Sequence, residues 1–196
     1  MSYMEIGLPD KLSLENHGDY IEIVRRWFGL KIVFLSIFAA LWDAFLLFWY
    51  SVVLSNANVP VMMLLIPLVH VAVGVAITYS ALAGWLNRTH VLVSHEDLAI
   101  RHEPIPWLGG LALKSREIQQ LYSKEVVSYS RNGRSVTYQL HAITLDGRNI
   151  KLVSGLESSE QVLYMEQQIE KYLRIADRPV KGEIGGGNRP SEGRWG

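Results

Sequence analysis

The chain has 196 residues, of which 49% are hydrophobic and 19% charged, and its 19 Lys and Arg balance its 19 Asp and Glu. Zero net charge argues against binding to extended nucleic acid, because proteins held by phosphate contacts carry an excess of basic residues. The absence of cysteine excludes disulfides, thiolate metal sites and a thiol nucleophile. Two long apolar runs indicate a membrane protein with a soluble part.

The N-terminal segment, residues 1–28, is predicted to form a β-hairpin. Leu12 and Leu14 alternate with polar residues before an Asn-His-Gly-Asp turn, and Ile21 and Ile23 alternate with polar residues after it. A two-residue loop would place all four apolar side chains on one face. Because an isolated two-stranded hairpin is only marginally stable in water, we expect this one to dock on the soluble domain.

The next segment, residues 29–86, contains two apolar runs with predicted transmembrane helices at about 31–54 and 60–86. Each run exceeds the ~20 residues that a helix needs to cross the hydrocarbon core. A signal peptide would be shorter, and it would not be followed by a second run. The turn between the runs is short, so the sequence predicts an antiparallel transmembrane helical hairpin.

Basic residues flank the two runs and are absent from the turn that joins them. Lys11, Arg25, Arg26 and Lys31 precede the first run, and Arg88 follows the second. Because Lys and Arg near the ends of a span are retained on the cytoplasmic side, both termini are predicted to be cytoplasmic. Four of these residues are also candidate contacts for anionic phospholipid headgroups, although the topology signal alone accounts for them: Arg25, Arg26, Lys31 and Arg88.

One ionisable residue lies in the interior of each predicted span: Asp43 and His70. They are almost equally far along the chain from an apex near Ala57, so we expect them to lie at the same depth and to pair. Such a pair would be a polar clasp that fixes the hairpin or an oligomer, or part of an intramembrane proton or ion relay. Pro67 should also free the carbonyl of Met63 as an acceptor.

Small residues predict two packing faces on the helices. The expected intramolecular seam consists of Ser36, Ala40 and Asp43 in the first span and of His70, Gly74 and Thr78 in the second. A second ridge at four-residue spacing would suit a helix from another copy of the chain or from a membrane protein partner: Ala72, Ala76, Ser80 and Gly84.

Residues 87–175 are predicted to form a cytosolic β-domain with a C-terminal helix. A loop at His95-Glu96 should pair Val93 with Leu98 and Val91 with Ile100. An Asn132-Gly133 turn should then place Tyr129 opposite Val136 and Val127 opposite Tyr138. An Asp146-Gly147 turn should pair Ile143 with Ile150, and a change of apolar parity indicates a bulge between Leu140 and Ile143.

The pattern changes to that of an amphipathic helix over residues 159–174, with Ser158 or Ser159 as N-cap. Its apolar face is formed by Val162, Met165, Ile169, Tyr172 and Leu173. Residues 176–196 are rich in glycine and charge and are predicted to be a disordered tail. With the N-terminal hairpin included, the prediction is an α+β protein in which seven antiparallel strands are followed by a C-terminal helix.

This plan and several short motifs resemble bacterial small inner-membrane proteins with two transmembrane helices and a PH-like (pleckstrin-homology-like) cytosolic domain. The similar stretches are residues 20–28 (YIEIVRRWF), 42–45 (WDAF), 48–50 (FWY), 87–89 (NRT) and 118–122 (IQQLY). The resemblance implies a transmembrane hairpin inserted in a PH-like domain and a location in the bacterial inner membrane. It carries no catalytic residues.

The sequence lacks the motifs that mark common enzyme sites, including Gly-rich phosphate loops, HExxH and GxSxG. His90, His95 and His102 share one predicted hairpin but lack a carboxylate or Cys at ligand spacing, so no metal site is expected. No catalytic residues and no cofactor are expected either. The loop that contains Trp107 and Leu108 is unusually apolar. It is a candidate for contact with a partner or with the membrane interface; the alternative is that it covers the open end of the sheet.

The sequence therefore predicts a non-enzymatic inner-membrane module whose PH-like domain mediates protein or lipid contacts and self-association. The alternative is a subunit of a membrane transport or channel assembly that uses the Asp43 and His70 pair.

Overall fold

A computed structural model describes residues 6–56, 58–130, 133–176, 178, 180 and 182–184. The chain divides into two compact units, which are described separately here. The soluble unit comprises Met1–Arg25, Thr89–Arg101 and Leu108–Gly196, and the helical unit comprises Arg26–Arg88 and His102–Trp107. Most of the predicted tail, 176–196, lies outside the described residues. Within the described part of that tail, Glu183 forms a β-bridge with Lys124.

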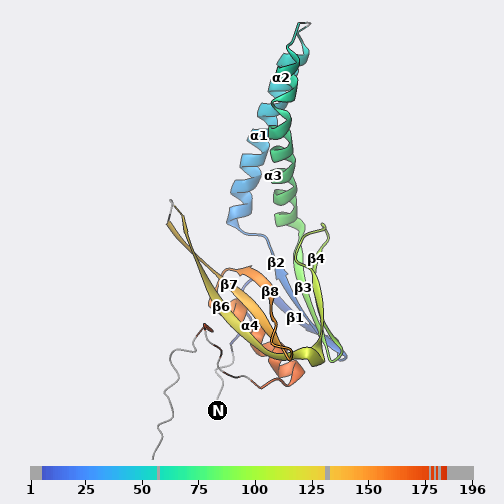
Figure 1. Cartoon of the computed structure of the whole chain (residues 1–196), viewed down its shortest axis with the longest axis vertical. Coiled ribbons are helices and arrows are strands. Elements are labelled where there is room, and N and C mark those ends of the chain that lie inside the picture. Colours follow the sequence, from blue (N-terminus) through green and yellow to red (C-terminus); the bar gives the residue numbers. More distant parts are fainter. Residues whose placement is uncertain are drawn as a thin grey trace, which may run out of the picture. The chain divides into compact units, whose positions relative to one another are not determined.

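The strands and helices follow one another in the order that Figure 1 shows. The elements are β1 (Leu12–Asn16), β2 (Tyr20–Arg26), α1 (Leu30–Leu54), α2 (Val61–Leu65), α3 (Leu68–Leu86), β3 (Arg88–Ser94), β4 (Asp97–Glu103), β5 (Leu111–Lys114), the 3-10 helix η1 (Ser115–Glu117), β6 (Ile118–Ser130), β7 (Gly133–Thr144), β8 (Asn149–Leu156) and α4 (Ser159–Leu173). The helices α1 to α3 thus lie between β2 and β3 in the chain.

The strands form two antiparallel sheets. The five-stranded sheet has the order β1-β2-β3-β4-β5, and the three-stranded sheet has the order β6-β7-β8. The described residues contain eight strands, so the expected number of seven was wrong. The additional strand, β5, is only four residues long and pairs with β4.

The N-terminal hairpin has the predicted face, but the expected two-residue loop was wrong, because β1 ends at Asn16, β2 begins at Tyr20 and Asn16 pairs with Ile21. Leu14 pairs with Ile23, and the apolar side chains of β1 and β2 belong to the core. The predicted His95-Glu96 loop is also confirmed, because it separates β3 from β4 and Val91, Val93, Leu98 and Ile100 are at most 1% exposed.

Both sheets and α4 contribute to one hydrophobic core. Its buried members include Ile23, Val91, Val93, Leu98 and Ile100 from the larger sheet, Leu121, Leu140, Ala142 and Val153 from the smaller sheet, and Val162, Met165 and Ile169 from α4. Helix α4 begins after Ser158, whose Oγ accepts a hydrogen bond from the Gln161 backbone N–H. The predicted helix, its N-cap and its apolar face are therefore confirmed.

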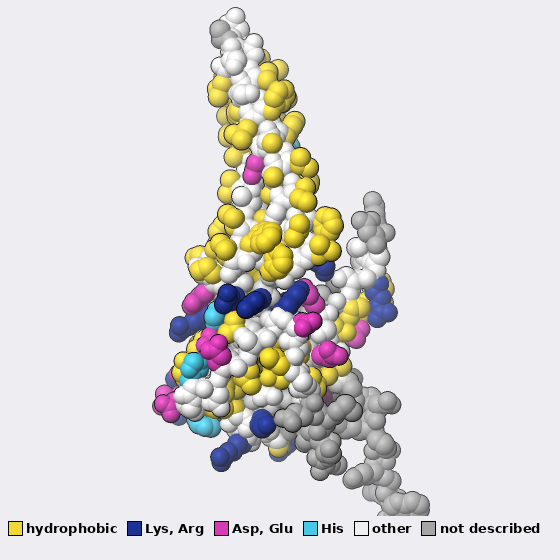
Figure 2. Space-filling view, turned by 180° about the vertical axis from the view of Figure 1, so that it is seen from behind, with side chains coloured by type: hydrophobic (Ala, Val, Ile, Leu, Met, Phe, Trp, Pro, Cys, Tyr) yellow, Lys and Arg dark blue, Asp and Glu magenta, His cyan; other side chains and the backbone are white. Residues whose placement is uncertain are grey.

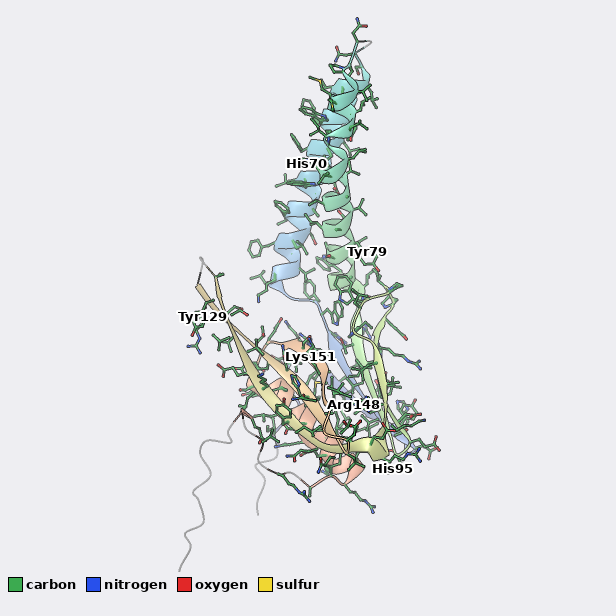
Figure 3. All side chains as sticks on the ribbon, in the orientation of Figure 1. His70, Tyr79, His95, Tyr129, Arg148 and Lys151 are labelled. Carbon is green, nitrogen blue, oxygen red and sulfur yellow. The ribbon has the colours of Figure 1, made fainter. Side chains whose placement is uncertain are left out.

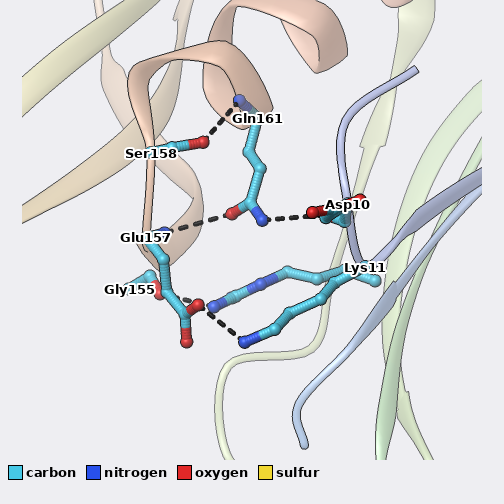
Figure 4. Close-up of polar contacts among 7 residues, drawn as sticks. Asp10, Lys11, Gly155, Glu157, Ser158 and Gln161 are labelled. Carbon is cyan, nitrogen blue, oxygen red and sulfur yellow. Dashed lines mark hydrogen bonds and ion pairs between the residues drawn. The ribbon is translucent and has the colours of Figure 1, made fainter. Parts of the chain in front are cut away.

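Polar contacts join the start of β1 to the start of α4, as Figure 4 shows. The Gln161 side chain donates to the Asp10 carbonyl at 3.0 Å and accepts from the Glu157 N–H at 3.1 Å. Lys11 forms an ion pair with Glu157 at 2.7 Å. These contacts hold the N-terminal hairpin against the start of α4.

Two predicted registers in the smaller sheet were wrong. Val127, not Tyr129, is the partner of Val136, because Gly133, expected in the turn, belongs to β7 and pairs with Ser130. A shift of two residues leaves every side chain on the same face, so the apolar pattern could not distinguish these registers.

The register of β7 and β8 also differs from the prediction. Ile150 pairs with Ala142, and Ile143 pairs with Asn149. A register irregularity lies between Leu140 and His141, so the predicted bulge between Leu140 and Ile143 is confirmed in position. The extra residue is on β8, where the consecutive residues Leu152 and Val153 are both buried. A bulge on the partner strand absorbs the extra residue, so the buried side of β7 keeps its alternation.

The helical unit contains two candidate membrane spans, Leu30–Leu54 and Val61–Leu86. Pro67 interrupts the second span between α2 and α3, because it lacks the N–H that a continuous helix requires. Only 11% of the most apolar window of each span is buried within the protein. A core helix of a soluble protein would instead be mostly buried, so the exposed apolar surface favours insertion into lipid.

Candidate membrane-interface site

The Asp43 side chain of α1 faces α3, where its hydrogen-bond partner is Thr78. The Thr78 hydroxyl donates to Oδ2 of Asp43 at 2.7 Å. His70, the partner expected from the sequence, instead stacks on the Trp42 ring with the centroids 5.9 Å apart. Side chains lean toward the N-terminus of their helix, so in an antiparallel pair Asp43 and Thr78 lean toward each other, while Asp43 and His70 lean apart.

The two helices pack through residues that alternate at spacings of three and four. In α1 the inward positions are Ser36, Ala39, Asp43, Leu46, Tyr50 and Val53, and in α3 they are Val71, Gly74, Thr78 and Ala81. This is the heptad pattern of a two-stranded coiled coil. Ala40, expected in the seam, is exposed, and Ala39 occupies that position. His70, also expected there, is exposed as well.

The second predicted ridge does not form one face. Ala72 and Ala76 are exposed, but Gly84 is buried against Ile32 of α1. A spacing of four residues turns about 40° around a helix at each step, because one turn takes only 3.6 residues. The ridge therefore begins on the exposed surface and ends in the intramolecular seam.

An apolar groove of about 500 Å³ runs beside the Asp43 and Thr78 pair. It is lined by Asp43, Leu46, Leu47 and Tyr50 of α1 and by Val71, Val75, Thr78, Tyr79 and Leu82 of α3. His70, which Figure 3 labels on the helical segment, does not line this groove. The two intramembrane polar residues thus have separate surroundings.

Aromatic donors of α1 bind backbone carbonyls of the interrupted span. Trp49 Nε1 donates to the Met63 carbonyl at 3.4 Å, and the Tyr50 hydroxyl donates to the Leu64 carbonyl at 3.2 Å. Met63 is the residue whose carbonyl Pro67 was expected to free, and that expectation is confirmed. In hydrocarbon such a carbonyl must find a partner within the protein, so these side chains stabilise the break in the helix.

Aromatic side chains gather where α1 begins and α3 ends. Phe28 packs on Trp85 with ring centroids 4.6 Å apart, and Trp27 and Tyr79 each contact Trp107. The Tyr79 hydroxyl also donates to the Pro106 carbonyl. Trp and Tyr concentrate at membrane interfaces because one end of each side chain is apolar and the other polar.

A buried asparagine fixes the loop that carries Trp107. Asn87, 1% exposed, follows α3, and its amide donates to the Ile105 carbonyl at 2.8 Å while its Oδ1 accepts from the Ile105 N–H at 2.7 Å. Trp107 is therefore held in the aromatic cluster of the helical unit. Leu108, the other candidate residue of this loop, is assigned to the soluble unit and is 91% exposed.

Three of the four candidate basic residues are exposed in the helical unit: Arg26, Lys31 and Arg88. Figure 2 shows hydrophobic side chains over the helices and Lys and Arg side chains at the end where α1 begins and α3 ends. Basic residues next to a membrane span attract anionic lipid, and Trp and Tyr are enriched at membrane–water interfaces.

Arg25 has a different environment. Its guanidinium donates to the Ser154 carbonyl at 3.1 Å and to the Gly155 carbonyl. Burial lowers the pKa of Arg25, an effect that the negative charge of Glu157 partly opposes. These two hydrogen bonds give Arg25 a structural role within the soluble unit.

Sequence reasoning missed Thr78 as the partner of Asp43 and Asn87 as the residue that fixes the loop. It also missed a cluster of Glu15, His17 and Glu22 in the N-terminal hairpin. The predicted hairpin gave a signal for this cluster, because its outward face brings polar side chains of the two strands, such as Glu15 and Glu22, side by side. Thr78 had been placed on the seam but not assigned a role.

No protein-family model matches this sequence, and no curated protein matches it.

Proposed function

We propose that this chain is a non-enzymatic module of the bacterial inner membrane, anchored by its helical hairpin and contacting anionic phospholipid at one end of that hairpin. The observation that carries the proposal is the group of exposed cations, Arg26, Lys31 and Arg88, in the same unit as the cluster of Trp27, Tyr79, Trp85 and Trp107. Cations and interfacial aromatic residues together mark the lipid headgroup level.

The positions of the basic residues support cytoplasmic termini. Arg26 and Lys31 flank the start of α1 and Arg88 follows α3, while residues 55–60 contain no Lys or Arg. Such an asymmetry retains the basic ends in the cytoplasm. The negatively charged lipids of the cytoplasmic leaflet would then face these cations, each of which contributes about 1 kcal/mol to binding.

Two antiparallel sheets and a C-terminal helix around one core support a PH-like soluble domain that mediates protein or lipid contacts and self-association. The additional strand β5 extends the larger sheet beyond the expected plan. The exposed hairpin of β6 and β7 offers one surface for such contacts: Tyr129, labelled near its tip in Figure 3, is 81% exposed.

A subunit of a transport or channel assembly is the second candidate, and the groove beside Asp43 is the observation that favours it. In that case Asp43→Asn would abolish transport while the hairpin stays folded, because the amide still accepts the Thr78 hydrogen bond. The expected relay between Asp43 and His70 does not support this candidate, because Asp43 bonds Thr78 and His70 stacks on Trp42.

The lipid proposal is tested by native mass spectrometry of the full-length protein released from nanodiscs of phosphatidylethanolamine and phosphatidylglycerol. We expect selective retention of phosphatidylglycerol by the wild type and its loss in a variant in which Arg26, Lys31 and Arg88 are changed to Gln. The matched control changes three exposed cations of the soluble unit to Gln: Arg116, Arg134 and Lys151. Equal retention by both variants would refute the lipid site.

The same spectra give the number of subunits, which tests self-association. Topology is tested independently, because the chain contains no cysteine and each introduced thiol is unique. In intact cells a membrane-impermeant maleimide should label Asn56→Cys, whereas Ser128→Cys should react only after the membrane is permeabilised. The reverse pattern would place the soluble unit outside the cytoplasm.

A further inference from the structure

Two carboxylates and two imidazoles gather on one face of β1, β2 and β3. Glu15 and Glu22 are cross-strand partners in the N-terminal hairpin. His17 lies in the loop that joins these strands, and His90 lies on β3. Like charges directly opposite each other destabilise a sheet, so this pair of glutamates calls for a positive charge between them.

The spacing of three of these groups fits a shared cation. His17 Nε2 lies 3.6 Å from Oε2 of Glu15 and 3.8 Å from Oε2 of Glu22. Both distances are too long for a hydrogen bond. They are close to the separation of about 3.3 Å between neighbouring ligand atoms of a tetrahedral zinc ion whose bonds are 2.0 to 2.1 Å long. All three ligand atoms lie within 4.8 Å of one another.

Neighbouring side chains already orient two of the three groups. His90 Nδ1 donates to the other carboxylate oxygen of Glu22, Oε1, at 2.5 Å. Glu22 is only 18% exposed, so this hydrogen bond directs its Oε2 toward His17. The His17 ring stacks on Tyr20 with centroids 4.6 Å apart and an interplanar angle of 20°. Metal sites depend on supporting contacts of this kind to hold their ligands in position.

We propose that Glu15, His17 and Glu22 bind one divalent transition-metal ion, with water completing its coordination and with His90 as a positioning residue. One imidazole nitrogen and two carboxylate oxygens suit zinc and similar metals, because imidazole is a ligand that zinc, copper, iron and nickel favour. The ion would neutralise the paired glutamates and fasten β1 to β2. This site is independent of the proposed lipid function.

The test uses full-length protein in detergent, without an affinity tag and stripped of metal with EDTA. Zinc chloride is titrated by calorimetry, and thermal unfolding is followed with and without saturating zinc. The wild type should bind one zinc per chain and gain about 5 °C or more in melting temperature. Cobalt chloride replaces zinc in a separate titration, in which visible absorption bands report direct coordination.

Four variants complete the test. Glu22→Gln and His17→Ala should each lower zinc affinity about tenfold or more and remove the gain in melting temperature. His90→Gln should lower affinity by a similar factor without changing the stoichiometry, as expected of a positioning residue. A control that changes both His95 and Glu96 to Gln removes the same residue types from another loop and should bind as the wild type does.

Circular dichroism in EDTA separates loss of the site from loss of the fold. A folded Glu22→Gln or His17→Ala protein that binds zinc as tightly as the wild type would overturn the proposal. So would a wild type that fails to bind one zinc at micromolar concentrations, in which case the three residues are only a polar surface cluster.

Discussion

The Thr78 hydroxyl binds Oδ2 of Asp43 at 2.7 Å, a hydrogen bond that joins α3 to α1. Gly74, one turn before Thr78, makes room for the carboxylate, since a Cβ at that position would stand 2.8 Å from Oδ1. A carboxylate in hydrocarbon is costly without a polar partner. The contact therefore stabilises one particular register of the hairpin.

Replacing Thr78 by Val should destabilise the hairpin by about 0.6 kcal/mol, the average for hydrogen bonds between membrane helices, and by at most about 1.7 kcal/mol. Thr78→Ser should retain most of the stability, because it keeps the hydroxyl. The control is Ser80→Ala, since the Ser80 hydroxyl donates to the Ala76 carbonyl of its own helix. Unfolding in detergent by titration with sodium dodecyl sulfate measures these differences. Equal stability of the Val and Ser variants would contradict the assigned hydrogen bond.

Gly84 permits the close approach of α1 and α3 where α1 begins and α3 ends. A Cβ there would stand 2.5 Å from Cδ1 of Ile32, so Gly84→Ala should cost about 1 to 3 kcal/mol despite the better helix propensity of Ala. Adding Ile32→Ala should remove this penalty, because the clashing atoms are absent. The control, Ala76→Val at an exposed position, should be almost neutral. Additive effects of the Gly84 and Ile32 changes would refute the contact.

Asn87 satisfies both backbone polar groups of Ile105. Asn87→Ala should destabilise the protein by about 1 to 3 kcal/mol, because a partly buried N–H and a partly buried carbonyl lose their partner. It should also increase the solvent exposure of Trp107, which hydrogen exchange or fluorescence quenching detects. Asn56→Ala is the control, since the Asn56 side chain donates to the Val52 carbonyl of the preceding helix α1. A fully stable Asn87→Ala protein would show that the loop is held by other contacts.

His141 should make stability depend on pH. Burial lowers the pKa of His141, although its hydrogen bond with Asn149 opposes this shift. The unfolded state then binds the proton more readily, so the contribution of His141 to stability is complete above its ordinary pKa of 6.5 and declines as the pH falls below it. His141→Gln should flatten that part of the stability curve. His95→Gln serves as the control, and identical curves for the wild type and His141→Gln would contradict this assignment.

Much of the soluble fold was predictable because burial on one face of a strand imposes a strict alternation. The N-terminal hairpin and the His95-Glu96 loop follow directly from that alternation and from short turns. The same alternation is blind to a shift of two residues, which explains the wrong partner of Val136. Strand β5 is too short for any periodic pattern, so only its pairing with β4 reveals it.

By itself, the sequence determined that two helices long and apolar enough to cross a membrane lie between β2 and β3, because length and hydrophobicity are local properties. Only the tertiary structure decided that Asp43 bonds Thr78, that Arg25 is engaged by Ser154 and Gly155, and that Glu15, His17 and Glu22 converge. Such partners depend on the direction in which each side chain leaves the backbone and on the registers of neighbouring elements. Spacing along the chain does not specify either of these.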